Sequence, residues 1–270
     1  MPTIHFLAGL PRSGSTLLMN ILAQNPDIHP TTTSPLPEAL VRARNSWQDI
    51  GAYSANPDHR ARDGALKGLL QGYYAHVEEP VVIDKHRGWP SHIELLEHLT
   101  QCDVKIICTV RCIVDILSSM EKLYRANKAV RRPEGEGQAA GQYLSVKGRA
   151  NVWMGEVGVI GSAYLNMQDA CARGYRDRLH FVEYGNLTKF PDKTLKKVYK
   201  FLGMEPYDSH DFVNVEQTTQ ENDYFHGFED LHTIRPTVAH QHSDATEVLG
   251  EELVALYSKP GAQFWRAPGF

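Results

Sequence analysis

The sequence predicts an α/β protein with a central parallel sheet between two layers of helices. Short apolar runs rich in β-branched residues alternate with long helical segments, which is the pattern of a parallel sheet covered on both faces. At 270 residues and 42% hydrophobic residues, the chain is long enough to bury one sizeable core. Because no internal repeat or low-complexity linker divides it, we expect a single domain over residues 1–270.

The strands and helices follow in alternating order along the chain. Apolar runs predict strands at 3–9, 80–84, 104–110 and 179–183. Helical patterns are expected at 15–24, 36–47, 60–77, 91–100, 112–127, 145–174, 191–202 and 245–257. The polar, Gly-rich stretch 131–138 is expected to be a surface loop or a mobile lid. Residues 214–244, rich in His, Asp, Gln and Thr, are expected to wrap over a ligand or another element.

Composition excludes several classes of function. With 28 Lys and Arg against 32 Asp and Glu, the net charge of -4 argues against a protein that coats nucleic acid or binds membranes through a polybasic surface. This net charge remains compatible with a small local pocket that binds an anion. The four cysteines form no CxxC pair, and no apolar run has the roughly 18 to 20 residues that span a bilayer. Since the N-terminus also lacks the pattern of a signal peptide, we expect a soluble, cytoplasmic protein.

The most informative segment is Gly-Leu-Pro-Arg-Ser-Gly-Ser-Thr at 9–16, between the first strand and the first helix. A Gly-rich turn at this place points backbone N–H groups and the positive end of a helix dipole at an anion. The segment has the outline of a Walker A loop, but Ser15 stands at the position of the Walker lysine and the cation is Arg12. Because P-loop NTPases use that lysine on the β- and γ-phosphates, the sequence disfavours an NTPase and favours a phosphate or phosphosulfate site.

The run from Pro11 to Leu18 resembles the 5′-phosphosulfate loop of sulfotransferases that use 3′-phosphoadenosine 5′-phosphosulfate (PAPS). The resemblance implies a P-loop NTPase-like three-layer α/β/α fold. It also implies that the donor's 5′ end is bound by Arg12, Ser13, Gly14, Ser15 and Thr16.

A second signature of that family is an Arg at a strand end and a Ser eight residues later, which hold the donor's 3′-phosphate. Arg111 follows the strand at 104–110, and Ser119 stands at the required spacing, with Ser118 as the alternative. A guanidinium and a hydroxyl from the first turns of a helix make a compact phosphate clamp. The sequence departs from the family's Arg-Asp-Pro or Arg-Asn-Pro by having Cys112 and Ile113.

Two later segments extend the resemblance. Residues 182–187, followed by a helix ending in Phe-Leu-Gly, are similar to the family's late strand and turn. Tyr184 in this turn either reaches the nucleotide or packs beneath the loop. His-Thr-Ile-Arg-Pro at 232–236 resembles the basic segment that crosses the bound nucleotide, which makes Arg235 a candidate ligand, with a solvated loop arginine as the alternative.

Sulfuryl transfer requires cations at the transferring group and a base for the acceptor proton. Arg12 is the first cation. Lys85, at the end of a strand, is the second, in a position similar to the family lysine that is aimed at the transferring group; its alternative role is a solvated strand cap.

The base has two candidates. Family members that act on sugars or on protein tyrosine carry a glutamate soon after the segment that corresponds to 25–29, and here the first carboxylate is Glu38. Glu38 could instead only complement a helix dipole. His86 is the rival, because cytosolic sulfotransferases place a catalytic His two residues after a Lys. The spacing here is one residue, so an extended chain would turn His86 to the face opposite Lys85.

These patterns predict a PAPS-dependent sulfotransferase that moves a sulfuryl group by in-line displacement to a hydroxyl or amine and releases adenosine 3′,5′-bisphosphate (PAP). The acceptor class stays open among small molecules, carbohydrates and peptides. No metal is expected, because fixed cations would replace Mg²⁺. The alternatives are a P-loop kinase acting on a small metabolite with ATP and Mg²⁺, and a non-catalytic nucleotide-binding module.

Overall fold

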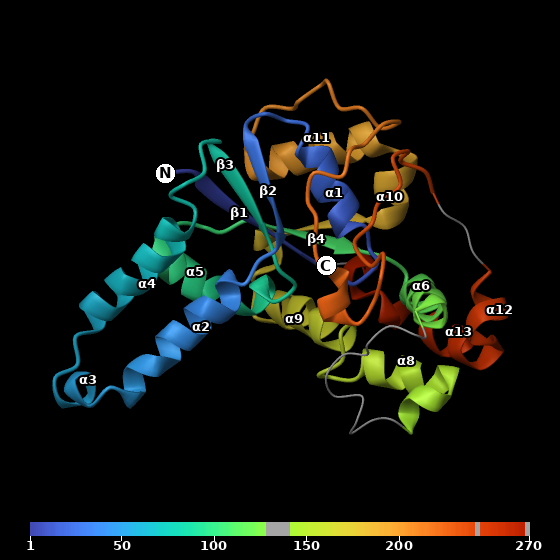
Figure 1. Ribbon diagram of the computed structural model, residues 1–270, viewed down its shortest axis with the longest axis horizontal. Helices are drawn as coiled ribbons and strands as arrows, with labels where there is room; N and C mark the ends of the chain where they lie inside the picture. The colour runs from blue at the N-terminus through green and yellow to red at the C-terminus, as the bar shows by residue number, and fades with distance from the viewer. Residues whose placement is uncertain (128–140, 241–243, 268–270) are drawn as a thin grey trace.

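The computed structural model describes residues 1–127, 141–240 and 244–267, and the loop expected at 131–138 lies outside these residues. Its centre is a five-stranded sheet in which every pair of neighbouring strands is parallel, in the order β2-β3-β1-β4-β5. The strands are β1 (Thr3–Gly9), β2 (Ile28–Thr33), β3 (Val81–Lys85), β4 (Ile106–Val110) and β5 (Leu179–Glu183). The expected three-layer α/β fold is confirmed (Figure 1).

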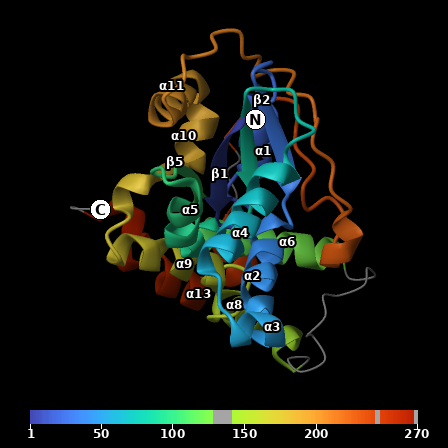
Figure 2. The same ribbon diagram turned by 90° about the vertical axis from the view of Figure 1, so that its left-hand side faces the viewer.

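Side chains alternate across the sheet and so build one core on each face. On β1, Phe6 and Ala8 belong to one buried cluster, whereas Leu7 belongs to the other. The Leu7 face is covered by α1 (Ser15–Leu22), α10 (Tyr184–Lys189) and α11 (Pro191–Leu202) (Figures 1 and 2). Because both faces are covered, the central strands are mainly apolar, as the sequence indicated.

The opposite face carries most of the remaining helices. Those that contribute buried residues to its core are α2 (Leu36–Ser46), α4 (His59–Tyr73), α5 (Ile93–Thr100), α6 (Ile113–Ala126), α8 (Val146–Met154), α9 (Gly161–Ala172), α12 (Ala245–Leu249) and α13 (Glu251–Tyr257). The short α3 (Gly51–Ala55) connects α2 to α4 at the tip of an arm that projects from the body (Figure 1). Among the described helices, none is both long and apolar enough to cross a membrane.

The structure differs from the sequence-based elements in several places, and the short helices α3 and α10 were not expected. Strand β2 was not expected, because its Pro30 and three threonines resemble a turn; it lies at the end of the strand order, where proline is tolerated. The helix expected over 145–174 is broken into α8 and α9 around Gly155 and Gly158. The helix expected over 245–257 is interrupted at Gly250, which has φ 81°.

Parallel pairing brings the carboxyl ends of the strands to one edge of the sheet. Leu7 of β1 pairs with Lys85 of β3, and Gly9 of β1 pairs with Thr109 of β4. The loop after β1, the end of β3 and the residue after β4 therefore meet at this edge. In open parallel sheets ligands bind beyond the carboxyl ends of the strands.

Candidate active site

A cavity of about 1290 Å³ opens at this edge of the sheet. Its lining includes residues of the loop after β1, the end of β3, the start of α6 and the late segment 224–239. The segment expected to wrap over a ligand or another element therefore covers the strand ends. Of the residues expected to form the site, those that line the cavity are Arg12, Gly14, Ser15, Thr16, Lys85, His86, Arg111, Ser119, Tyr184 and Arg235.

The loop between β1 and α1 has the backbone of an anion-binding turn. Arg12 and Gly14 both have positive φ, of 58° and 90°, and Gly14 is the N-cap of α1. A Cβ at Gly14 would come within 2.9 Å of the Tyr184 ring, so the position requires glycine for space as well as for conformation. Ser15 and Thr16 then begin the helix, where N–H groups lack intrahelical partners.

The side chain of Ser13, one of the expected donor ligands, is turned away from the cavity. It is fully buried and does not line the cavity. Its hydroxyl lies 2.7 Å from Thr109 Oγ1 and 3.0 Å from the Thr109 carbonyl oxygen. Ser13 therefore anchors the loop to β4.

The Arg–Ser pair expected at 111 and 119 comes together beside the loop. Arg111 donates from Nη1 to the Arg12 carbonyl at 3.2 Å, and its guanidinium lies 4.3 Å from the centre of the Tyr184 ring. Its Nε is buried without a hydrogen bond, 3.8 Å from Asp115 Oδ2. Ser119 lines the cavity, whereas Ser118 is fully buried.

Arg12 lies closer to this pair than the sequence suggested. Its Nε donates to Ser119 Oγ at 3.1 Å and its Nη1 to the carbonyl of Leu231. Burial and the neighbouring Arg111 lower the pKa of Arg12. Two guanidiniums and a hydroxyl thus face one space, which favours an anion there.

Tyr184 packs against Gly14 beneath the loop, which was one of its two expected positions, and it also lines the cavity. Arg235 is exposed and contributes to the cavity wall from the late segment.

Lys85 is buried and ion-paired, so the interpretation as a solvated strand cap is wrong. Its side chain is 7% exposed, and Nζ lies 2.5 Å from Oε1 of Glu221. Burial lowers the pKa of Lys85, and the charge of Glu221 opposes that shift. Glu221 was not among the expected site residues, because 136 positions separate it from Lys85 and it stands in no recognisable motif.

The two candidate bases, Glu38 and His86, contact each other. His86 Nε2 lies 3.1 Å from Glu38 Oε1, and His86 Nδ1 accepts from the backbone N–H of Gly88 at 3.0 Å. Since Nδ1 accepts, Nε2 carries the proton of the neutral ring and donates it to Glu38. Burial lowers the pKa of His86, and Glu38 opposes the shift. Glu38 is 56% exposed and lies outside the large cavity, in a shallow depression behind His86.

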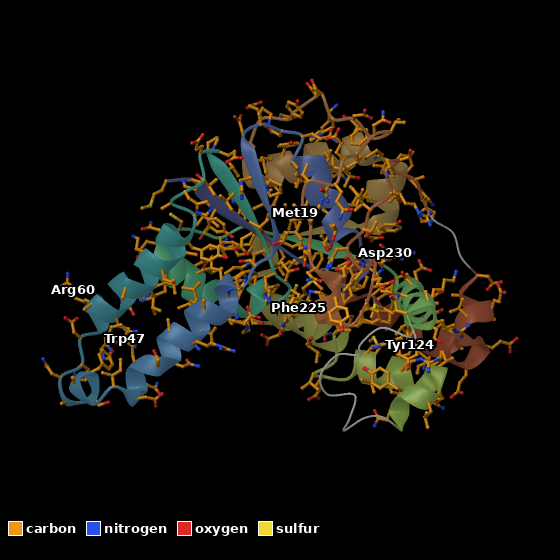
Figure 3. The ribbon with its side chains drawn as sticks, viewed as in Figure 1. Met19, Trp47, Arg60, Tyr124, Phe225 and Asp230 are labelled. Atoms are coloured by element: carbon orange, nitrogen blue, oxygen red, sulfur yellow. The ribbon has the colours of Figure 1, made fainter. Side chains whose placement is uncertain are left out.

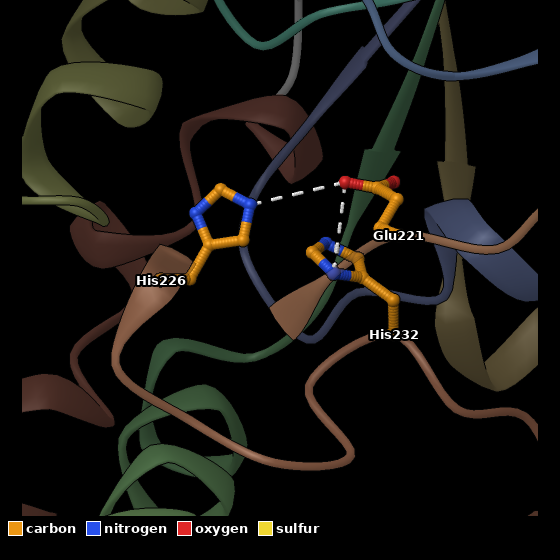
Figure 4. A group of neighbouring side chains, drawn as sticks. All are labelled: Glu221, His226 and His232. Atoms are coloured by element: carbon orange, nitrogen blue, oxygen red, sulfur yellow. Dashed lines mark ion pairs between the residues drawn. The ribbon is translucent and has the colours of Figure 1, made fainter. Parts of the chain in front are cut away.

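Three further side chains surround Glu221. His226 and His232 line the cavity, and Asp223 holds His232 through Oδ1, 2.5 Å from Nδ1. Ligand atoms of Glu221, His226 and His232 all lie within 4.8 Å of one another, so these residues could hold a metal ion (Figure 4). The abundance of His and Asp in 214–244 was the only sequence signal for this cluster.

The structure thus has a phosphate-type loop, an Arg–Ser clamp and a buried lysine on one cavity of an α/β fold. The chain matches the model described as "Sulfotransferase family" over residues 5–209, which is more than half of its length. It belongs to the sulfotransferase family and is a transferase of that type, which confirms the resemblance seen in the sequence.

Solved structures show the same fold. The sulfotransferase domain from the curacin biosynthetic pathway aligns with a TM-score of 0.56 at 17% identity, covering 94% of this chain and 98% of that domain. Mouse sulfotransferase SULT7A1 complexed with PAP aligns with a TM-score of 0.55 at 18% identity, covering 98% of this chain and 85% of that chain. Retinol dehydratase in complex with androsterone and PAP aligns with a TM-score of 0.54 at 14% identity, covering 100% of this chain and 82% of that chain. A search of curated protein sequences returned no match.

Proposed function

We propose that the protein uses PAPS as its sulfuryl donor and releases PAP. The observation that carries the proposal is the convergence of the 9–16 loop, the Arg111–Ser119 pair and Lys85 on one cavity. Two structural neighbours are complexes with PAP, which supports the same donor chemistry in this family member.

The cavity offers separate groups for the two ends of the donor. Arg111 and Ser119 are the groups for the 3′-phosphate, with the Tyr184 ring beneath and Arg235 across the nucleotide. Arg12, which the sequence assigned to the 5′ end, joins the 3′-phosphate groups in this proposal, because it donates to Ser119. The N–H groups of Gly14, Ser15 and Thr16 receive the 5′-phosphosulfate. Lys85, at the end of β3, stabilises the charge that develops on the transferring group and the leaving phosphate.

The acceptor is a hydroxyl or amine carried on an apolar or aromatic body. Aromatic and aliphatic side chains form much of the cavity wall beyond the cationic groups, namely Tyr124, Tyr143, Trp153, Val157, Val159, Tyr224 and Phe225. Such a wall binds apolar surface and orients it with few polar contacts. Phenols and apolar alcohols are therefore expected to be better acceptors than sugars. The four cysteines are free thiols, which fits the cytoplasm as the proposed compartment.

Calorimetry with PAP in a chelator tests the donor assignment. Wild-type protein is expected to bind PAP without metal, and Arg111→Ala to weaken binding about 10- to 150-fold, because a charged hydrogen-bond donor contributes about 1.5–3 kcal/mol. Arg60→Ala is the matched control, since Arg60 is exposed on the projecting arm (Figure 3). Equal PAP affinity in wild type and Arg111→Ala would reject the 3′-phosphate assignment. Binding of ATP with Mg²⁺ in place of PAP would indicate the alternative function, a P-loop kinase.

A further inference from the structure

A buried carboxylate from the late segment lies where the strand ends meet. Glu221 is 8% exposed, and its Oε1 accepts from the backbone N–H of Thr33 at 3.0 Å and from Lys85 Nζ at 2.5 Å. Thr33 ends β2 and Lys85 ends β3, so two neighbouring strands fix this oxygen. Thr33 lies in the segment after residues 25–29, in which family members carry a glutamate and this sequence has threonines.

The second oxygen of Glu221 is not fixed in this way. Its nearest charged or titratable neighbours are His232 Nδ1 at 3.7 Å and His226 Nε2 at 3.9 Å, both beyond hydrogen-bonding distance (Figure 4). Within the described part of the chain no hydrogen bond to this oxygen is seen. Glu221 itself is not part of the cavity lining, but the two histidines beside this oxygen are. A carboxylate held by one oxygen, with the other next to residues that line the cavity, has the geometry of a proton acceptor.

The neighbouring imidazole of His232 is already committed. Asp223 accepts from His232 Nδ1 and, through Oδ2, from its backbone N–H at 2.9 Å. Burial lowers the pKa of His232, and the hydrogen bond to Asp223 opposes that shift. The charged and titratable groups around Glu221 are Lys85, Arg87, His226 and His232, and Asp223 lies beyond them, on His232.

We propose that Glu221 is the general base of sulfuryl transfer, an inference that rests on the proposed function. The acceptor oxygen forms its bond to sulfur while its proton passes to Glu221 Oε2. The bond between sulfur and the bridging oxygen of the donor breaks, and its electron pair stays on the 5′-phosphate of PAP. Lys85 leaves Glu221 for the sulfuryl and bridging oxygens when the donor binds, and the proton later leaves Glu221 for solvent.

The shared lysine couples donor binding to the strength of the base. Burial raises the pKa of Glu221, but the charge of Lys85 and the hydrogen bonds from Lys85 and Thr33 outweigh it and hold the pKa below its ordinary value. When Lys85 turns to the donor, the opposing effect of burial remains and the pKa of Glu221 rises. The base therefore becomes stronger only when a donor is in place.

The other candidates are less suited to accept the proton. Both ring nitrogens of His86 are engaged, Nδ1 with Gly88 and Nε2 with Glu38. Glu38 is 56% exposed and lines a separate depression, without a contact to Lys85. A divalent metal on Glu221, His226 and His232 would lie next to the Lys85 ammonium, which repels it, and would compete with Asp223 for His232 Nδ1. Glu221 is therefore better placed to accept a proton than to bind a metal ion together with His226 and His232.

The test compares Glu221→Gln with Glu216→Gln, an exposed glutamate of the same segment. PAPS and PAP affinities are measured by calorimetry, and kcat with the best acceptor of a phenol and alcohol panel is measured between pH 5 and 9, with and without a chelator. Glu221→Gln is expected to lower kcat about 10²- to 10⁴-fold, the usual contribution of a general base. Donor affinity is expected to stay equal or become tighter, because Lys85 loses its competing partner.

The pH profile provides a readout that a structural role would not change. Wild-type kcat is expected to fall at acid pH as Glu221 takes up a proton, and this fall should be absent from the residual activity of Glu221→Gln. A kcat within threefold of wild type, a loss matched by lost donor affinity, or a rate that disappears in chelator would overturn the inference. So would a comparable kcat loss seen only in Glu38→Gln. If the wild type neither binds PAP nor transfers sulfuryl, the proposed function itself fails and this inference fails with it; when the wild type is active, the variants decide on Glu221 alone.

Discussion

A buried ion cluster on α6 leads to a quantitative prediction about stability. Glu121 is fully buried, and its carboxylate accepts from Arg149 Nη2 at 2.6 Å, Arg149 Nε at 2.7 Å and Arg125 Nε at 2.7 Å. Arg149 also stacks 4.5 Å above the Tyr124 ring. The cluster ties α8 to α6, the helix that carries Ser119. Glu121→Ala would leave the guanidinium of Arg149, whose side chain is 9% exposed, without its counter-charge.

The expected loss in the free energy of unfolding follows from the burial of the Glu121–Arg149 ion pair. Removing one partner of a buried ion pair typically destabilises a protein by about 3–5 kcal/mol, whereas an exposed pair is worth about 0–1 kcal/mol. Glu252→Ala is the matched control, because the Lys147–Glu252 pair has a similar distance of 2.5 Å but side chains 58% and 73% exposed. Urea unfolding at low salt should show a loss about 3 kcal/mol larger for Glu121→Ala. If the two variants differ by less than about 1 kcal/mol, the cluster does not hold α8 to α6 as argued.

Three further predictions concern single positions. Gly14→Ala should cost about 1–2 kcal/mol in urea unfolding and weaken PAP binding in calorimetry, because Gly14 has φ 90° and a methyl group would meet Tyr184; unchanged PAP affinity would contradict the role of this turn. Ser119→Ala should weaken PAP binding about threefold to tenfold, the effect of one neutral hydrogen bond, and a variant that binds like wild type would remove Ser119 from the clamp. Burial, and secondarily Lys105, lower the pKa of His5 from 6.5 to about 4. The unfolded state therefore binds the extra proton between these values, and stability should fall as the pH drops through this window, by at most about 1.4 kcal/mol per pH unit from this group; His5→Gln should flatten the fall in thermal unfolding, and an unchanged slope would exclude His5 as its source.

The parts of the site that were predictable from sequence are local along the chain. The 9–16 loop is contiguous, and Arg111 and Ser119 are only eight residues apart, with Arg111 just before α6 and Ser119 on it, so the family's spacing suffices to name both. Consecutive helical residues point in different directions, which agrees with Ser119 lining the cavity while Ser118 is buried. Strand alternation likewise produced the two-sided core around β1.

The remaining parts depend on contacts between distant segments. Lys85 finds Glu221 only after the late segment has crossed the strand ends, and irregular chain of this kind has no period that a sequence pattern could reveal. Strand β2 forms because β3 offers it a free edge, despite Pro30. The break between α8 and α9 depends on close packing, since a Cβ at Gly158 or Gly161 would collide with backbone carbonyl groups of the preceding turn.

The end of β3 offers a third candidate for proton transfer besides the two that the sequence suggested. Lys85 and His86 are consecutive, and each has a carboxylate of its own, Glu221 for Lys85 and Glu38 for His86. The family's early glutamate favoured Glu38, the first carboxylate after residues 25–29. Its partner His86 has both nitrogens engaged, whereas Glu221 has one oxygen without a hydrogen bond in the described part of the chain, beside the lysine expected to act on the sulfuryl group. A lysine shared between donor and base makes the two steps of the reaction depend on each other, because the charge that stabilises the leaving group is the charge that weakens the base when no donor is bound.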